Sequence, residues 1–435
     1  MKHTVKNRKY MKKIKKNKTR KTRNTRKTRK TRNTKRTKIS KKIILKSKTP
    51  SDILKLSREI SSDLSSDLSS DLSLGKGIRD LISTKISTKK SSYSPSINKD
   101  LITLKSIPRE KIEGCNNKLA FQLKEPLRIM VSGDLFGKEC VKYDDHKAKK
   151  FLLKNLSANK HIMPSNVVPP IQNQSNCWFN TMFVALFVSD KGRKFFHYFR
   201  QLMIEGKQSN GSHIPHNLRD AFALLNFAIE SSLTGNKYAY ELDTNNIIKQ
   251  IYASIPAEYK KSMPYVVKVD QASNPIRYYN SIINYLGNND LHILFVSNIS
   301  TAPNWKEKIK MELMNSSNKK PHIIVLEIFD SNNSSGHSGE IVDKETRFNI
   351  EDLNYKLDSC IVRDIEQQHF CATVTVENQE MAYDGMSFHR MVPMKWKDLL
   401  NKNDKWTFEG STNLDESNLE WSFLHGYQML IYYRV

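Results

Sequence analysis

Hydrophobic and polar positions divide the chain into a long polar N-terminal part and a patterned body that begins near residue 118. In the body, apolar residues at helical spacing come first and strand-length apolar runs come second. The predicted helices span residues 144–156, 177–199 (which Asp190-Lys191-Gly192 can interrupt), 216–232 and 243–253. The predicted strands span residues 127–131, 292–296, 322–328, 355–362, 370–376, 381–384 and 427–433. Helices followed by strands indicate an α+β fold with a site between the two parts.

The first segment of the polar part is strongly basic. Residues 1–48 contain 24 Lys or Arg and no Asp or Glu, with near-repeats of Thr-Arg-Lys. Like charges at this density repel and little apolar surface is available to bury, so we predict a disordered tail. Such a tail can act as a nuclear-import signal or bind nucleic acid or another polyanion. The alternative is a solvated tail with no specific target.

The second segment, residues 49–117, is rich in Ser and Lys and is predicted to be a low-complexity linker. Within it, Ser-Ser-Asp-Leu repeats three times over residues 61–73, and the leucines recur every four residues. That spacing can form one helical stripe, but serine prefers caps and turns. We therefore predict disorder, with a short partner-binding helix as the alternative. Residues 118–435 then form the folded domain.

Charge outside the tail is nearly balanced. The whole chain carries +28, yet residues 49–435 hold 48 basic and 44 acidic residues. No run of about 18 apolar residues indicates a membrane span, and no apolar segment near the N-terminus indicates a secretory signal. We therefore expect no membrane partner.

The number and spacing of the cysteines also limit which kinds of site the chain can contain. There are five, widely spaced and without a CxxC pair, which argues against a zinc ribbon and against a disulfide framework. We expect no metal, no cofactor and an intracellular location, cytoplasmic or nuclear, in a host cell if the chain is viral. Their positions are Cys115, Cys140, Cys177, Cys360 and Cys371.

Cys177 stands where a polar loop meets a strongly apolar helical stretch. A helix N-terminus favours an anion and can lower a cysteine pKa from about 8.5 toward 3.5–7.5. The position is therefore that of a catalytic nucleophile, and the alternative is a buried structural cysteine. The side-chain amides just upstream are candidate donors to an oxyanion. They are Gln172, Asn173, Gln174 and Asn176.

A histidine and an aspartate flank a predicted hairpin downstream. His369 begins a strand and Asp384 ends the returning strand. A two-residue loop at 377–378 would place Asp384 opposite Cys371, within side-chain reach of His369. A four-residue loop would place it opposite Thr373, out of reach unless the strand bulges. An imidazole can take the thiol proton, and a carboxylate can hold the imidazole in one tautomer.

Other residues compete for these roles. His337, His389 and His425 are alternative bases, and Asp364 and Glu366 are alternative acids. Asp384 could instead cap the Asp-Gly turn.

The motifs resemble those of the ubiquitin-specific proteases, a papain-like group. Asn176-Cys177-Trp178-Phe179-Asn180 is similar to the end of their cysteine box, Asn-x-Gly-Asn-Thr-Cys-aromatic-x-Asn. His369 with the strand after it and Tyr383-Asp384 is similar to their histidine box. Further similar strands are His322 to Phe329, Tyr355-Lys356-Leu357 and Gly426 to Arg434, so the resemblance covers about residues 165–435.

The resemblance implies a helical thumb and a β-sheet palm, with the C-terminal tail of ubiquitin in the cleft between them. It implies Cys177 as nucleophile, His369 as general base, Asp384 as orienting acid and Gln172 as oxyanion donor, although the family has Asn at that last position. Gln368 replaces the glycine before the histidine, the loop glycine before the cysteine is missing, and the fingers are reduced or metal-free. The implied activity is a deubiquitinase. Alternatives are a papain-like protease for other proteins and a non-enzymatic, polyanion-binding protein.

Overall fold

The computed structural model describes only part of the chain, all of it within one unit, Ser40–Val435. Statements about the structure below concern these residues. The described residues are 42–45, 109–112, 114–132, 137–157, 162–271, 273–297, 304–317, 320–329, 343–365, 368–413 and 415–435. The predictions for residues 1–41 and 61–73, and the candidates His337 and Glu366, lie outside them.

An eight-stranded sheet organises the C-terminal half. Its strands follow the order β10-β9-β8-β7-β13-β5-β4, and β6 pairs with β7. Only β4 and β5 are parallel; the other pairs are antiparallel. The strands are β4 (Ile293–Val296), β5 (Ile323–Ile328), β6 (Arg347–Ile350), β7 (Leu353–Arg363), β8 (Phe370–Val376), β9 (Gln379–Tyr383), β10 (Met391–Pro393) and β13 (Gln428–Arg434).

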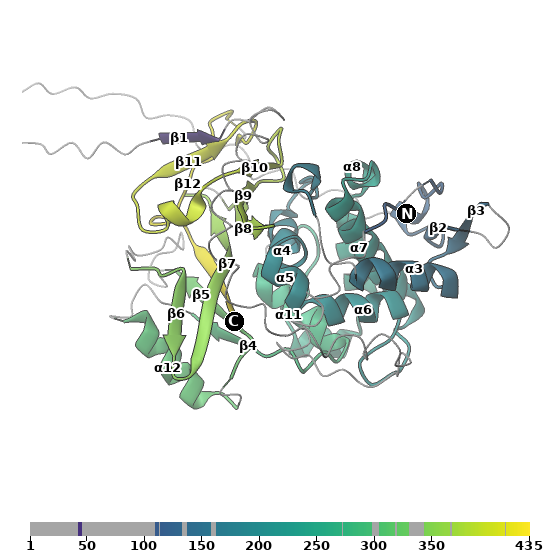
Figure 1. Ribbon diagram of the computed structural model, residues 1–435, viewed down its shortest axis with the longest axis horizontal. Coiled ribbons are helices and arrows are strands. Elements are labelled where there is room, and N and C mark those ends of the chain that lie inside the picture. The colour runs from purple at the N-terminus through teal and green to yellow at the C-terminus, as the bar shows by residue number, and fades with distance from the viewer. Residues whose placement is uncertain are drawn as a thin grey trace, which may run out of the picture. The chain divides into compact units, whose positions relative to one another are not determined.

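Both faces of this sheet are buried, which explains why its central strands read as continuous apolar runs. Successive side chains point to opposite faces. Ile323 and Val325 therefore join the core shared with the helices, while Ile324 and Leu326 join a second core on the other face. Figure 1 shows the teal helices on the first face and α12 (Trp305–Asn315) on the second.

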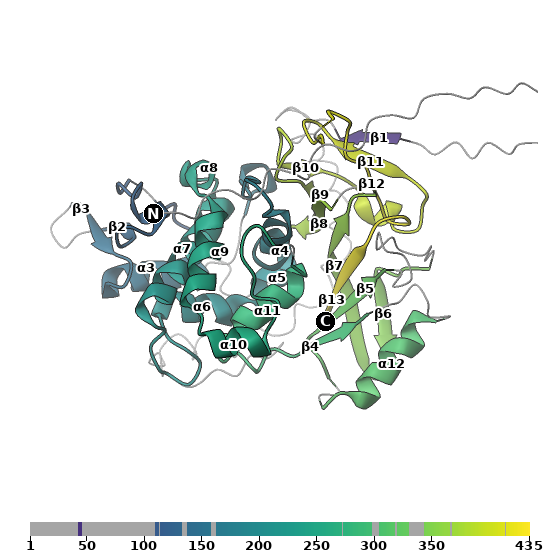
Figure 2. The same cartoon turned by 180° about the vertical axis from the view of Figure 1, so that it is seen from behind.

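The helices of the N-terminal half surround α4, which is buried along its whole length. Figure 2 shows them from behind, with α9 and α11 in front. They are α3 (His146–Ser157), α4 (Cys177–Phe187), α5 (Asp190–Phe195), α6 (His197–Glu205), α7 (His216–Thr234), α8 (Tyr238–Glu241), α9 (Thr244–Ser254), α10 (Ala257–Ser262) and α11 (Pro275–Tyr285). The 3₁₀ turns are η1 (Ala120–Gln122), η2 (Pro164–Asn166) and η4 (Trp396–Leu399).

Two smaller sheets complete the description. One pairs β2 (Arg128–Ser132) with β3 (Lys138–Lys142). The other places β11 (Lys405–Phe408) between β12 (Trp421–Ser422) and β1 (Lys42–Leu45). β1 lies inside the segment predicted to be a disordered tail.

The α+β prediction and every predicted strand are confirmed, with ends that shift by one or two residues. The predicted helix 177–199 is three helices instead. Ser189 is the N-cap of α5: its side chain accepts a hydrogen bond from the Gly192 N–H at 3.0 Å. A new helix therefore begins here, and α4 does not continue. α11 was not predicted, although Asn274 at its N-cap and Pro275 at its first position are start signals that the sequence carries.

The folded part begins before the predicted boundary at residue 118. Ile112 is fully buried, and Arg109 donates to both carboxylate oxygens of Glu230 at 2.7 Å. Cys115 and Cys140 form a disulfide, which the wide cysteine spacing led us not to expect. The boundary was drawn from average composition, and these few anchoring residues stand at the end of a long Ser- and Lys-rich segment. The average therefore does not reveal them.

The described residues hold no helix long and apolar enough to cross a membrane. The same part of the chain contains no group of three His, Cys, Asp or Glu side chains suited to a metal ion.

Candidate active site

Cys177 is the first residue of α4 and is 8% exposed. Aromatic packing fixes this end of the helix: the Trp178 ring lies 4.8 Å from that of Tyr278 on α11, edge to face. Thr181 donates its hydroxyl to the Cys177 carbonyl at 2.9 Å. As the first helical residue, Cys177 presents an N–H that has no partner within its own helix.

The loop before Cys177 is held by amide side chains. Asn176 is fully buried; its Oδ1 accepts from the Asn173 N–H at 3.2 Å, and its Nδ2 donates to Thr244 at 3.0 Å. Asn180 donates to the Ile171 carbonyl at 3.0 Å. Asn176 is thus committed to holding the loop and does not serve as an oxyanion donor.

Gln172, the candidate donor that the resemblance favours, is placed by its backbone. Its N–H donates to the Gly385 carbonyl at 3.0 Å, which ties the cysteine loop to the residue after Asp384. Its side-chain Nε2 points to the Gln174 carbonyl at 3.3 Å. In this conformation the amide supports the loop, and it must rotate to face an oxyanion.

The hairpin that carries His369 and Asp384 has the two-residue loop. Val376 pairs with Gln379, and Glu377 and Asn378 both have positive φ, 47° and 62°. Two consecutive left-handed residues make the turn that best matches the twist of a hairpin. Since Ala372 pairs with Tyr383, the next pair outward sets Asp384 opposite Cys371, diagonal to His369.

His369 links the other two residues. Its Nε2 lies 2.6 Å from Asp384 Oδ1, and its ring also interacts with the Cys177 side chain, whose thiol faces the Gln368 carbonyl at 4.0 Å. Because Nε2 is engaged by the carboxylate, Nδ1 is the nitrogen left for the thiol. The three residues come from the start of α4, the start of β8 and the end of β9. In space, the thiol, the imidazole and the carboxylate follow one another as a nucleophile, a base and an orienting acid would.

Burial and charge act in opposite directions on the imidazole. Burial lowers the pKa of His369, but the Asp384 carboxylate and the hydrogen bonds with Asp384 and Cys177 outweigh it and raise the pKa to about 10. The arrangement therefore stabilises the protonated ring beside the sulfur.

Asp384 is fully buried and its remaining bonds are to residues that sequence reasoning missed. Ser411 donates its hydroxyl to Oδ2, and the Met386 N–H donates to Oδ1 at 3.3 Å. The second bond is the turn cap predicted as an alternative role, so Asp384 caps the turn as well as contacting the imidazole. Trp421 packs on the other side of the His369 ring, with centroids 5.7 Å apart. No sequence signal marks Ser411 or Trp421, because Ser411 lies in a loop and Trp421 in a two-residue strand, both remote from the motifs.

The alternative residues lie elsewhere. His425 pairs with Asn403 at 2.7 Å, and His389 is exposed on the turn after Asp384. Asp364 accepts from the backbone N–H of His369 at 3.1 Å, so it steadies the main chain rather than the ring.

A cleft of about 430 Å³ opens beside the thiol. Cys177 and Trp178 form part of one wall, and Gln368 and Phe370 part of another. Tyr427 also lines it and donates its hydroxyl to the buried carboxylate of Glu327 at 3.1 Å. The cleft therefore gives access to the Cys177 side chain.

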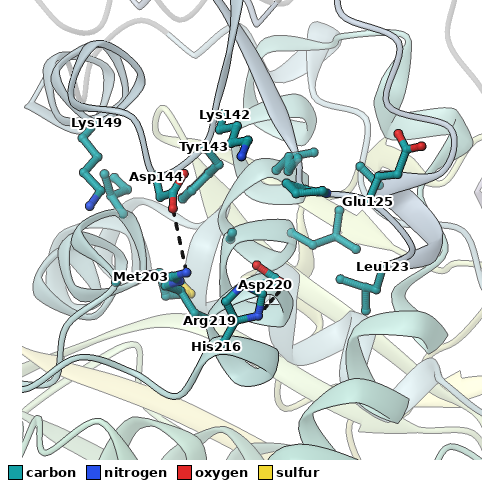
Figure 3. A pocket seen from close by; sticks show the side chains of 17 residues that line it. Leu123, Glu125, Lys142, Tyr143, Asp144, Lys149, Met203, His216, Arg219 and Asp220 are labelled. Carbon is teal, nitrogen blue, oxygen red and sulfur yellow. Dashed lines mark ion pairs between the residues drawn. The ribbon is translucent and has the colours of Figure 1, made fainter.

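A second hollow, of about 100 Å³, lies among α3, α6 and α7 (Figure 3). Charged side chains rim it, with Arg219 3.8 Å from Asp144 and His216 3.6 Å from Asp220. Neither Cys177, His369 nor Asp384 lines it, so it is not part of the candidate site.

Comparisons with known proteins give weak similarity only. No family model and no curated protein matches the chain. An essential yeast splicing factor is 9% identical at TM-score 0.37, over 77% of this chain and 78% of that one. The SAGA DUB module Ubp8/Sgf11/Sus1/Sgf73 bound to monoubiquitin is 10% identical at TM-score 0.40, over 63% and 71%. The same module bound to ubiquitin aldehyde scores 0.38, over the same shares. These values assign no family, so the function has to be argued from the site.

Proposed function

We propose that the chain is a thiol-dependent isopeptidase that hydrolyses the bond after the C-terminal glycine of ubiquitin or a ubiquitin-like protein. The observation that carries the proposal is the placement of His369 between the Cys177 thiol and the Asp384 carboxylate. The cleft beside Cys177 supports a polypeptide substrate. The resemblance of the cysteine and histidine motifs to ubiquitin-specific proteases supports the choice of modifier.

The reaction follows from the geometry. Cys177 gives its proton to Nδ1 of His369, and the sulfur attacks the carbonyl carbon of the terminal glycine. The Cys177 N–H at the helix start, and Gln172 after rotation, can donate to the resulting oxyanion. The protonated ring then gives its proton to the leaving lysine amine, which leaves a thioester. Water attacks the thioester, His369 takes the water proton and returns it to the sulfur, and the carboxylate product leaves.

A ubiquitin whose C-terminus carries a thiol-reactive group tests the proposal. We expect it to label the wild-type protein and to fail with Cys177→Ala. Cys360→Ala is the matched control, because Cys360 is also a buried free cysteine but lies in the sheet core. Labelling that persists in Cys177→Ala would refute the nucleophile.

The same experiment tests the choice of substrate separately from the choice of nucleophile. If a general thiol reagent modifies Cys177 while the ubiquitin reagent does not, the result favours the alternative of a papain-like protease for other proteins. A Cys–His pair should also give a bell-shaped pH profile of kcat/KM.

A further inference from the structure

We propose that Asp190 is a positioning residue that sets the register of Cys177 against His369 by holding the far end of the β8–β9 hairpin. The proposal rests on the proposed function for its catalytic meaning, but its geometry stands apart from the substrate. It concerns a contact at the opposite end of α4 from the thiol.

The first observation is that α4 and β8 pack against each other. α4 spans roughly 15 Å at the helical rise per residue, and Asp190 begins the next helix three residues after its end. His369 to Glu377 spans roughly 25 Å at the strand rise. Cys177 meets His369 at one end of this pair, and Asp190 meets the hairpin turn at the other.

The second observation is the form of the contact. The two Asp190 oxygens accept from two consecutive N–H groups: Glu377 N at 2.8 Å and Asn378 N at 3.0 Å. Both turn residues have positive φ, so the turn presents both N–H groups to a single carboxylate. Two hydrogen bonds from adjacent residues to one carboxylate fix both the position and the orientation of the turn.

Arg193 closes the contact. Its Nη2 donates to Asp190 at 2.6 Å and to the Glu377 side chain at 2.9 Å, and the Arg193 side chain is 5% exposed. The start of α5 is also bonded to β7, because Asp358 accepts from the Lys191 N–H at 2.9 Å. The residues Asp190, Arg193, Glu377 and Asn378, called here the hairpin clamp, thus join the cysteine-bearing helices to the histidine-bearing sheet.

The need for a clamp follows from the rest of the α4–β8 contact. The facing side chains there are apolar, such as Ala372 and Val374 of β8. Apolar contact is non-directional and does not by itself define a register. A slide by one helical residue, about 1.5 Å, would be enough to change the separation of the Cys177 thiol and the His369 ring by half the length of a hydrogen bond.

The test uses Asp190→Ala and Asp190→Asn, with Glu307→Ala as the matched control. Glu307 is also an acidic residue in a first helical turn with a basic partner three residues on, Lys310 at 2.7 Å, but it lies on α12. On a ubiquitin-tail fluorogenic substrate we expect Asp190→Ala to lower kcat at least tenfold with KM within twofold. Asp190→Asn keeps one accepting oxygen and should fall between. Glu307→Ala should match the wild type.

The second readout is the rate of Cys177 alkylation by iodoacetamide as a function of pH, which needs no substrate. We expect Asp190→Ala to lower the alkylation rate near neutral pH, because the sulfur loses the protonated imidazole beside it. If kcat per folded molecule and the alkylation profile both stay at wild-type values in Asp190→Ala and Asp190→Asn, the clamp is only structural and the proposal is overturned. A wild type inactive on the ubiquitin substrate would refute the proposed function, and the alkylation profile would still decide the clamp.

Discussion

His369 and Asp384 are 15 residues apart in sequence, yet Nε2 and Oδ1 are 2.6 Å apart because a two-residue turn folds β9 back on β8. The pair is buried, with the histidine side chain 8% exposed and the aspartate side chain fully covered. A carboxylate in this position selects the tautomer that leaves Nδ1 free to accept the thiol proton.

Asp384→Asn should be a mild variant. Oδ1 accepts from the Met386 N–H as well as facing Nε2, so an amide should keep its oxygen at that position and hold the same tautomer. A neutral acceptor replaces a charged one, at a cost of about 1.4 kcal/mol, or about tenfold in kcat/KM. Asp384→Ala removes the acceptor entirely and should cost at least about 100-fold. Steady-state kinetics on the fluorogenic substrate measure both.

The contrast between the two variants is the informative quantity. Equal losses would mean that Asp384 acts through its charge alone, and that the Met386 N–H does not control the amide orientation. Circular dichroism and denaturant unfolding of both variants serve as the control for folding.

The local patterns that determine the fold were readable in advance. Strands buried on both faces appear as nearly continuous apolar runs, so β5 and β13 were predictable from their runs alone. The hairpin register was not, because two loop lengths fit the sequence and only the left-handed φ of Glu377 and Asn378 selects one.

The site was predictable to the extent that its residues adjoin regular elements. Cys177 starts a helix, His369 directly precedes a strand, and Asp384 directly follows a strand. Ser411, Trp421 and the role of Asp190 depend on tertiary contacts between segments tens to hundreds of residues apart. No local pattern carries that information.

Gly385→Ala should damage the site by a close approach of two loops. A Cβ at this position would lie 2.9 Å from the Gln172 nitrogen and 3.0 Å from the Gln172 Cβ. The loops must separate, which weakens the Gln172 N–H to Gly385 carbonyl bond. We expect a loss of about 1–3 kcal/mol in the free energy of unfolding and a fall in kcat. Denaturant unfolding and kinetics check the two effects.

Gly137→Ala is the matched control, since a Cβ there meets nothing within 4 Å. It should leave both quantities near wild type. Full activity in Gly385→Ala would show that the contact between the two loops does not matter for catalysis.

Gln174→Gly should stabilise the protein slightly. Gln174 has a φ of 59°, in the left-handed region, where a residue with a Cβ pays about 1–2 kcal/mol. Glycine removes that cost. Its greater backbone freedom in the unfolded chain, however, lowers the free energy of unfolding by about 0.5–1 kcal/mol. The expected net gain is therefore about 0.5 kcal/mol in denaturant unfolding. Gln174→Val should instead destabilise, because β-branched residues tolerate positive φ worst. A gain in the valine variant would contradict the assigned backbone conformation.

The His369–Asp384 pair should also give folding a defined pH dependence. The pKa of His369 is raised from 6.5 to about 10 in the folded protein, despite the opposing effect of burial, chiefly by Asp384. The folded state then binds the proton more tightly than the unfolded state, so this stabilisation is fully present below pH 6.5 and is lost as the pH rises toward 10.

Asp384→Ala removes the main cause of the shift. The difference in free energy of unfolding between wild type and Asp384→Ala should therefore be largest near pH 6 and shrink toward pH 10. Lys191 and Lys344, whose pKa values are lowered to about 8 by burial, titrate in the same window, but both proteins contain them and their contributions cancel. Urea unfolding at intervals between pH 6 and 10 measures the difference, and a constant difference over that range would mean that the carboxylate does not hold the proton on His369.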